Sequence, residues 1–264
     1  MLKTHIDITA DLHMHTPLCH HAQGEMEEYV QAAIAVGLKE ICFLEHLERG
    51  INYFEVTWLN DDEFATYLNE GRRLQKKYRN RLKIGLGVEI GYNPNCRHEI
   101  LAFLSRHQWD QIGISYHFLQ TTDDYHLNMV SSKPVNQEAA DRYGVEQVIS
   151  EYLKGLLNAI NYLPGTILCH LDAVLRHHPD VCFTSNHHRM ILTLLDAVAA
   201  KGMALEINTS GYRHRAEPYP AGPVVLAALH RGIKLCASSD AHRPEQVGRN
   251  FDRLPEFIAH ATRA

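Results

Sequence analysis

The sequence lacks a long apolar run, a basic N-terminal segment followed by an apolar one, and any low-complexity stretch. The first two absences argue against a membrane span and a secretory signal, so we expect a cytoplasmic protein with no membrane partner. No Pro/Gly-rich linker divides the 264 residues, which predicts one domain over residues 1–264 with a substantial core. The apolar fraction of 45% and the charged fraction of 22% are typical of globular proteins.

Excess positive charge is also missing. The formal net charge is -5, so we expect a small substrate and no extended nucleic acid, although a local groove could still be basic. The cysteines form no CxxC pair and several lie in apolar runs, so we expect six reduced core residues: Cys19, Cys42, Cys96, Cys169, Cys182 and Cys236. Histidine, in contrast, is abundant at 19 residues, and its imidazole is both a metal ligand and a proton carrier near neutral pH. Composition alone therefore points to a metal site.

Short apolar or β-branched runs alternate with segments of helical apolar spacing. The expected strands are 6–12, 40–45, 82–88, 111–116, 165–169, 203–208 and 233–238. Three expected helices end at Gly37, Gly202 and Gly232, where left-handed C-caps would lie, and Thr184 or Ser185 is the expected N-cap of the second. This alternation predicts a mainly parallel sheet with helices outside. The segment 121–143 is polar without a clear period, and we interpret it as a mobile flap.

Polar side chains gather at the ends of the expected strands, and their placement decides between a closed barrel and an open doubly wound sheet. In a closed barrel all carboxyl ends of the strands meet at one mouth, where barrel enzymes build their sites, whereas an open sheet would spread them. We therefore predict an α/β fold of the TIM-barrel type. The strand-end residues are Asp11, His13, His15, His46, Glu89, His117, His170, Asp172, Asn208, Asp240 and His242.

Two pairs of possible metal ligands have a spacing of two residues. His13 and His15 leave the same face of an extended chain and can share one ion, and the spacing returns at Asp240 and His242. Either pair alone could consist of surface residues. A barrel brings the two ends of the chain side by side, however, and so favours a shared site.

Single residues follow the other strands. Glu89 would be costly at a strand end unless a cation or a donor compensates its charge, and an ion pair with lysine or arginine is the structural alternative. A lone histidine in such a position is usually a hydrogen-bonded rim residue, which is the alternative for each of His46, His117 and His170. Together at one barrel mouth these residues predict a metal site.

Seven motifs extend over nearly the whole chain: DLHMHTPLCHHA (11–22), EH (45–46), GVEIGY (87–92), SYHFL (115–119), CHLD (169–172), LEINTSGYR (205–213) and SSDAHRPEQVGRNFD (238–252). In these motifs the chain resembles the polymerase and histidinol phosphatase (PHP) superfamily, and within it the histidinol-phosphatase branch. The resemblance implies a distorted seven-stranded (β/α)7 barrel, a single PHP-type metal-dependent phosphatase domain, and divalent zinc, iron or manganese ions. Two positions depart from the usual pattern: Glu45 replaces an aspartate, and His20 replaces a smaller residue.

The resemblance also implies a ligand set for two to three ions. His13, His15, Glu89 and Asp240 would hold one ion, and Glu89 would bridge to a second held by His117 and His170. A third would be held by His21, His46 and His242, and only the resemblance chooses His21 over His20. Glu89, Asp240 and His242 are the expected catalytic residues.

Hydrolysis of a phosphomonoester needs charge neutralisation and an activated water, which clustered divalent ions supply. A guanidinium suits the remaining phosphate oxygens, so Arg213 and Arg176 are the expected phosphate-binding residues, with a surface ion pair as the alternative for each. The resemblance implies hydrolysis of L-histidinol phosphate in histidine biosynthesis. Two alternatives stay open: a phosphatase or phosphodiesterase acting on nucleotides or nucleic-acid ends, and a non-catalytic metal-binding module. An acidic group should face the substrate amine, and the sequence does not choose between Asp172 and Glu217.

Overall fold

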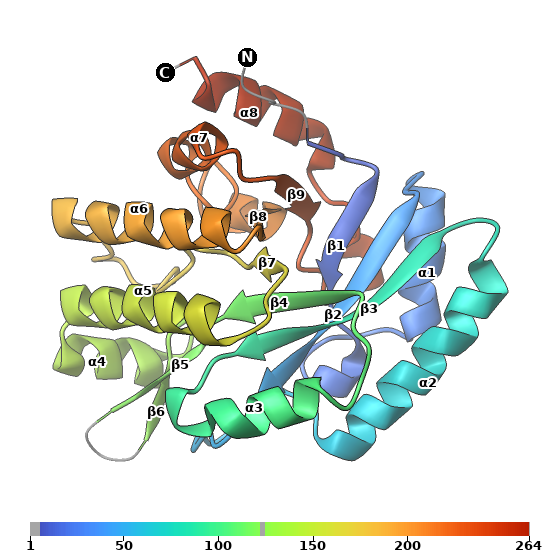
Figure 1. Cartoon of the computed structure of the whole chain (residues 1–264), viewed down its shortest axis with the longest axis horizontal. Helices are drawn as coiled ribbons and strands as arrows, with labels where there is room; N and C mark the ends of the chain where they lie inside the picture. The colour runs from blue at the N-terminus through green and yellow to red at the C-terminus, as the bar shows by residue number, and fades with distance from the viewer. Residues whose placement is uncertain (1–5, 122–124, 264) are drawn as a thin grey trace.

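The computed structural model describes residues 6–121 and 125–263, and its centre is a seven-stranded parallel sheet (Figure 1). Short β-branched and apolar segments form the strands because both faces of the sheet are covered. The strands run in spatial order β1 (Ala10–Met14), β2 (Glu40–Glu48), β3 (Lys83–Gly91), β4 (Gln111–Ser115), β7 (Ile167–Leu168), β8 (Ala204–Asn208) and β9 (Leu235–Ser238).

The last strand returns to the first. Met14 pairs with Ala241 in a parallel bridge, and the His15 amide donates to the Ala241 carbonyl at 2.9 Å. The Asp240 amide donates to the His13 carbonyl, also at 2.9 Å. The sheet is therefore a nearly closed, distorted barrel, which confirms the prediction of a barrel over an open sheet. Closure depends on the same two segments that carry the HxH and DxH motifs.

Helices surround this sheet, with α1 and α2 on the right of Figure 1 and α5 and α6 on the left. Glycines end three of them as predicted, since Gly37, Gly202 and Gly232 have φ of 81°, 66° and 71°. The Thr184 hydroxyl caps α6 by accepting from the His187 amide. The helices are α1 (Met26–Ala35), α2 (Asp61–Tyr78), α3 (Arg97–Leu104), α4 (Pro134–Tyr143), α5 (Val145–Tyr162), α6 (Ser185–Ala200), α7 (Gly222–His230) and α8 (Leu254–Ala261). Over residues 6–121 and 125–263, no helix combines the length and apolar character needed to cross a bilayer.

Several expected boundaries were wrong. The first strand begins at Ala10, so it includes His13, and the second and third strands extend past His46 and Glu89. These side chains therefore project from within strands. Polar residues misled the assignment because they stand within these strands where apolar residues usually mark a buried strand.

The segment 121–143 has more structure than its polar sequence indicated. β5 (Phe118–Gln120) pairs with β6 (His126–Asn128) in an antiparallel hairpin, and α4 follows. Residues 122–124 of the expected flap lie outside the described residues. All six cysteines are free as expected, but the prediction that all are core residues was wrong because Cys182 is exposed.

Tyr67 joins α2 to the barrel wall. Its side chain is fully buried, and its hydroxyl lies 3.0 Å from the carbonyls of Phe43 on β2 and Gly87 on β3. The same hydroxyl accepts from the Gly87 amide at 3.1 Å. The Tyr67 hydroxyl is thus a polar partner for buried backbone groups of both strands, which α2 would otherwise cover with apolar atoms.

We expect Tyr67→Phe to lower the free energy of unfolding by about 1–3 kcal/mol, because it leaves buried backbone groups without their side-chain partner. Tyr78→Phe is the matched control on the same helix, since its hydroxyl donates to the partly exposed Glu27 carboxylate and not to strand backbone. Urea unfolding monitored by circular dichroism measures both. Equal losses in the two variants would contradict the role given to the Tyr67 hydroxyl.

Candidate metal centre

Glu89 lies at the centre of the barrel mouth, fully buried on β3. Its Oε1 is 2.8 Å from His170 Nε2 and 3.2 Å from His117 Nε2. Its Oε2 is 2.8 Å from His46 Nδ1, 3.4 Å from His13 Nε2 and 3.7 Å from His15 Nε2. Each carboxylate oxygen therefore faces a different group of imidazoles.

The two motifs at the ends of the barrel meet beside Glu89. His15 Nε2 lies 3.0 Å from His13 Nε2 and 3.3 Å from Asp240 Oδ1. His242 Nδ1 lies 3.6 Å from the same Asp240 oxygen. The structure thus brings the HxH and DxH motifs together, as the closure of the barrel requires.

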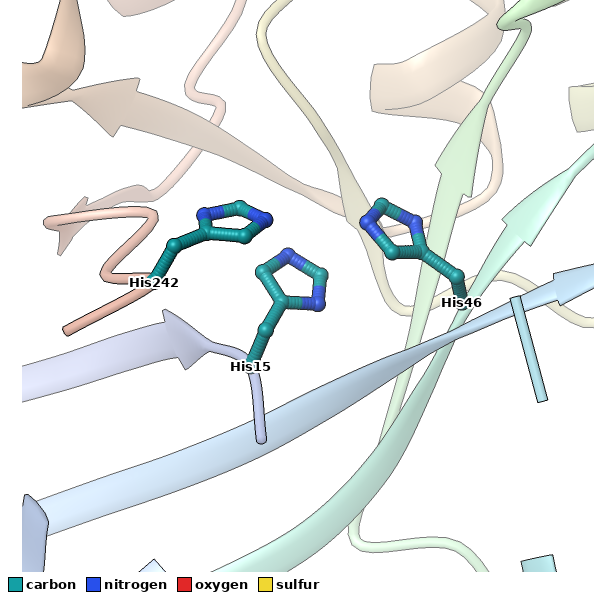
Figure 2. A group of neighbouring side chains, drawn as sticks. All are labelled: His15, His46 and His242. Carbon is teal, nitrogen blue, oxygen red and sulfur yellow. The ribbon is translucent and has the colours of Figure 1, made fainter. Parts of the chain in front are cut away.

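Figure 2 shows His15, His46 and His242 with their rings pointing toward one another. The centroid of His15 is 4.1 Å from that of His46 and 4.3 Å from that of His242. His21 lies on the outer side of this group, with its centroid 4.5 Å from His242 and 5.3 Å from His46. All nine expected ligands consequently belong to one cluster, whereas His20 turns away to Glu63.

Two buried carboxylates contact His13 and His117 through the ring nitrogen that faces away from Glu89. Glu206 on β8 places Oε1 2.6 Å from His13 Nδ1 and accepts from the His170 amide through Oε2. Glu48 on β2 places Oε1 2.8 Å from His117 Nδ1. A carboxylate behind a ligand imidazole fixes the orientation of the ring and leaves its other nitrogen free for an ion. Gly91 is needed beside Glu48, because a Cβ there would lie 1.7 Å from Glu48 Oε1.

The electrostatics of the cluster follow from this burial. Burial alone would raise the pKa of Glu89, but the imidazoles of His117, His13 and His46 hold the pKa of that carboxyl well below its ordinary value. Burial would likewise lower the pKa of His117, yet Glu89 and Glu48 raise it to about 10. Burial lowers the pKa of His21 to about 3, and neighbouring His46 adds to the effect. The Glu89 carboxylate therefore carries its charge, which the surrounding cations compensate.

Backbone conformation at two candidate ligands is unusual. His170 and Asp240 have φ of 23° and 50°, in the left-handed region that side chains other than glycine seldom adopt. Such conformations persist where the surrounding structure imposes them, often at functional sites. Here the His170 amide bonds to Glu206 and the Asp240 amide to the His13 carbonyl.

The donor set fits divalent metal ions. Imidazole nitrogens and carboxylate oxygens converge in groups whose ligand atoms lie within 4.8 Å of one another, among them His13, His15 and Asp240, and His46, Glu89 and His117. Among the described residues, buried His242 Nε2 has no hydrogen-bond partner, and Glu89 Oε2 has none with suitable hydrogen-bond geometry although His46 Nδ1 lies 2.8 Å away. An ion would satisfy both atoms, since unpaired buried polar groups are otherwise costly.

The expected arginines lie beside this cluster and not within it. Arg213 ends the 3₁₀ helix η3 (Thr209–Arg213) after β8 and lines a hollow with Arg176, Arg243, Arg249 and Asp240. The hollow is therefore lined by basic side chains, and it shares His21, Asp240 and His242 with the candidate ligand cluster. This placement is compatible with the phosphate-binding role expected of Arg213 and Arg176.

The two acidic residues considered for the substrate amine are both engaged elsewhere. Asp172 receives two hydrogen bonds of 3.1 Å from the Arg215 guanidinium and a third from the Ala221 amide. Glu217 accepts from the Gly222 amide at 3.1 Å. Both therefore hold the loop that follows η3.

A family model described as "PHP domain" matches residues 11–210. The chain belongs to the PHP domain family. The match begins at Asp11, two residues before the HxH pair, and includes Glu89, His117, His170 and Glu206. It thus extends over most of the candidate metal centre.

Relatives of this PHP domain include a probable histidinol-phosphatase of Deinococcus radiodurans, 32% identical over 91% of this chain and 89% of that protein. A histidinol-phosphatase of Bacillus subtilis is 29% identical over 93% and 98%. Among solved structures, histidinol phosphate phosphatase of Lactococcus lactis, complexed with zinc, L-histidinol and phosphate, is similar with a TM-score of 0.74. It is 23% identical, and the match covers 96% of this chain and 93% of that one, which supports the fold.

Sequence reasoning missed Glu206 and Glu48 in this PHP domain. Glu206 was visible within the LEINTSGYR motif as a charged residue inside an apolar strand, which is an unusual position for an unpaired carboxylate. Glu48 follows His46 by two residues and leaves the same face of β2. The signal in both cases is a charge on the inner face of a barrel strand.

We expect Glu206→Gln to weaken Zn²⁺ binding about 10–100-fold, because His13 would lose the anionic partner that orients its ring. Titration against a chromophoric chelator measures the affinity, and urea unfolding of the metal-free variant tests whether the barrel survives. A folded variant with unchanged Zn²⁺ affinity would show that Glu206 only supports the strand.

Proposed function

We propose that this protein is a metal-dependent phosphomonoesterase that hydrolyses L-histidinol phosphate to L-histidinol and phosphate. The observation that carries the proposal is the buried Glu89 carboxylate, which divides five imidazoles between its two oxygens beside an arginine-lined hollow. Relatives named as histidinol-phosphatases over nearly the full chain support this substrate.

The proposed ligand set comprises two to three sites for zinc, iron or manganese. Glu89 is proposed to bridge two of them, because its oxygens face separate histidine groups. When bound, such ions neutralise phosphate charge and provide an activated water near neutral pH. The proposed ligands are His13, His15, His21, His46, Glu89, His117, His170, Asp240 and His242.

The chain's own side chains would orient the substrate. Arg213 and Arg176 are proposed to bind the phosphate oxygens that point away from the ligands, since a guanidinium donates two parallel hydrogen bonds to such a group. Asp240 lies between the ligand cluster and this hollow, with Oδ1 near both His15 and His242. We assign Glu89, Asp240 and His242 to the reacting centre, where they would hold the ions, and the Asp240 carboxylate would accept the proton of the attacking water and pass it to the leaving oxygen.

Chelation is expected to abolish phosphate release, and added Zn²⁺, Fe²⁺ or Mn²⁺ should restore it. In a substrate panel, kcat/KM for L-histidinol phosphate should exceed that for a nucleoside monophosphate and for phenyl phosphate. Preference for the nucleotide would favour the nucleotide-directed phosphatase. Stoichiometric metal without turnover of any substrate would favour a non-catalytic metal-binding module.

Arg213→Met should lower kcat/KM for the preferred substrate by more than tenfold through both KM and kcat, since the guanidinium would contact ground state and transition state alike. Metal content, measured by plasma emission, should stay as in the parent protein. Arg231→Met is the control, because Arg231 pairs with Asp196 at the surface. If Arg213→Met retained full kcat/KM, the phosphate role would pass to Arg176.

A further inference from the structure

Two hollows meet over the candidate metal centre. They share His21, Arg176, Asp240 and His242, but their remaining walls differ in charge. One is the arginine-lined hollow described above. The other is a cavity of about 300 Å³ that extends from the cluster toward the β5–β6 hairpin and the segment after β2.

Four acidic residues line this second cavity, and three of them are committed to histidines. Glu89 and Asp240 lie within the ligand cluster, and Glu48 is held by His117. The fourth is Glu55, from the segment between β2 and α2. Among the described lining residues, Glu55 is thus the carboxylate that no histidine holds, and its partner Lys133 lines the same cavity.

The segment that carries Glu55 is anchored to the hairpin. The Asn52 amide bonds to His126 Nδ1 at 3.1 Å, and the His126 amide donates to the Asn52 carbonyl at 3.0 Å. The Tyr53 hydroxyl accepts from Asn136 on α4 at 2.7 Å. These contacts hold the backbone next to Glu55 against β6 and α4, so its position at the cavity is defined.

Glu55 already binds a cation in this structure. Its Oε1 forms an ion pair with the Lys133 ammonium group, and each side chain is 42% exposed. Lys133 Nζ also lies 5.0 Å from the ring centroid of Phe54. Half-exposed pairs contribute little stability, about 0–1 kcal/mol, so another cation can replace the lysine at small cost.

We propose that Glu55 determines specificity by binding the ammonium group of the substrate's leaving alcohol in place of Lys133. The inference rests on the proposed function, because L-histidinol phosphate carries a phosphate at one end, an imidazole at the other and an amine on the carbon between them. In the proposed orientation the phosphate points toward Arg213 and the amine toward Glu55, on either side of the shared residues Asp240 and His242. The charge difference between the two hollows sets that orientation.

The test compares kcat/KM for L-histidinol phosphate with kcat/KM for phenyl phosphate, which has no cation. Glu55→Gln should lower this ratio at least tenfold, mainly through KM for L-histidinol phosphate, and should raise the inhibition constant of L-histidinol. Lys133→Met should keep or increase the ratio, because it removes the competing cation. Glu40→Gln is the matched control, since Glu40 forms a 2.7 Å pair with Lys83 at the opposite ends of the strands.

Each outcome has one interpretation. If the parent protein prefers L-histidinol phosphate and Glu55→Gln keeps the ratio, the role of Glu55 is overturned while the proposed function stands. An equal fall for both substrates also overturns it, because Glu55 would then act on the site in general. A parent protein without preference for L-histidinol phosphate overturns the proposed function and this inference with it.

Discussion

The carboxylate of Glu89 is the constraint on which the rest of the site depends. It is fully buried, and its charge is retained because imidazoles from four different strand regions surround it. A buried carboxylate without such partners would be neutral or destabilising. The barrel must therefore close well enough to bring β1, β2, β4 and the end of β7 around one residue of β3.

The hydrogen bonds that close the barrel also position candidate ligand residues. The hydrogen bonds that join β1 to the segment after β9 involve the backbone of His13, His15 and Asp240, whose side chains enter the cluster. The left-handed backbone at Asp240 turns its carboxylate inward at that junction. Behind the ligands, Glu206 and Glu48 fix the rings of His13 and His117.

Charge is divided between the two sides of the site. Arginines from the segments after β7, β8 and β9 gather on one side, whereas Glu55 is the available carboxylate on the other. These charges lie on the segments that connect the strands, whereas most candidate ligands project from strands and strand ends. The candidate ligands are thus positioned by the barrel strands. The charged residues that would bind a substrate are carried by the segments that connect those strands.

The sequence by itself predicted the barrel class and eight of the nine candidate ligands that the structure brings into one cluster. It could do so because ligands such as His13, His15 and Asp240 follow the period of an extended chain, and parallel strands must share one mouth. The helix ends at Gly37, Gly202 and Gly232 were also predictable from the sequence, because each depends on a single glycine with a left-handed backbone. The family resemblance added His21, which no periodicity marks.

Only the tertiary structure decided which carboxylates serve the ligands and which can serve a substrate. No local sequence pattern distinguishes Glu206, Glu48 and Glu55. In the structure the first two contact histidine rings, whereas Glu55 lines the cavity. Asp172 follows a strand and is a candidate by position, but Arg215, distant in sequence, binds it. Pairings of this kind join residues far apart along the chain, so their partners are set by packing and not by any local pattern.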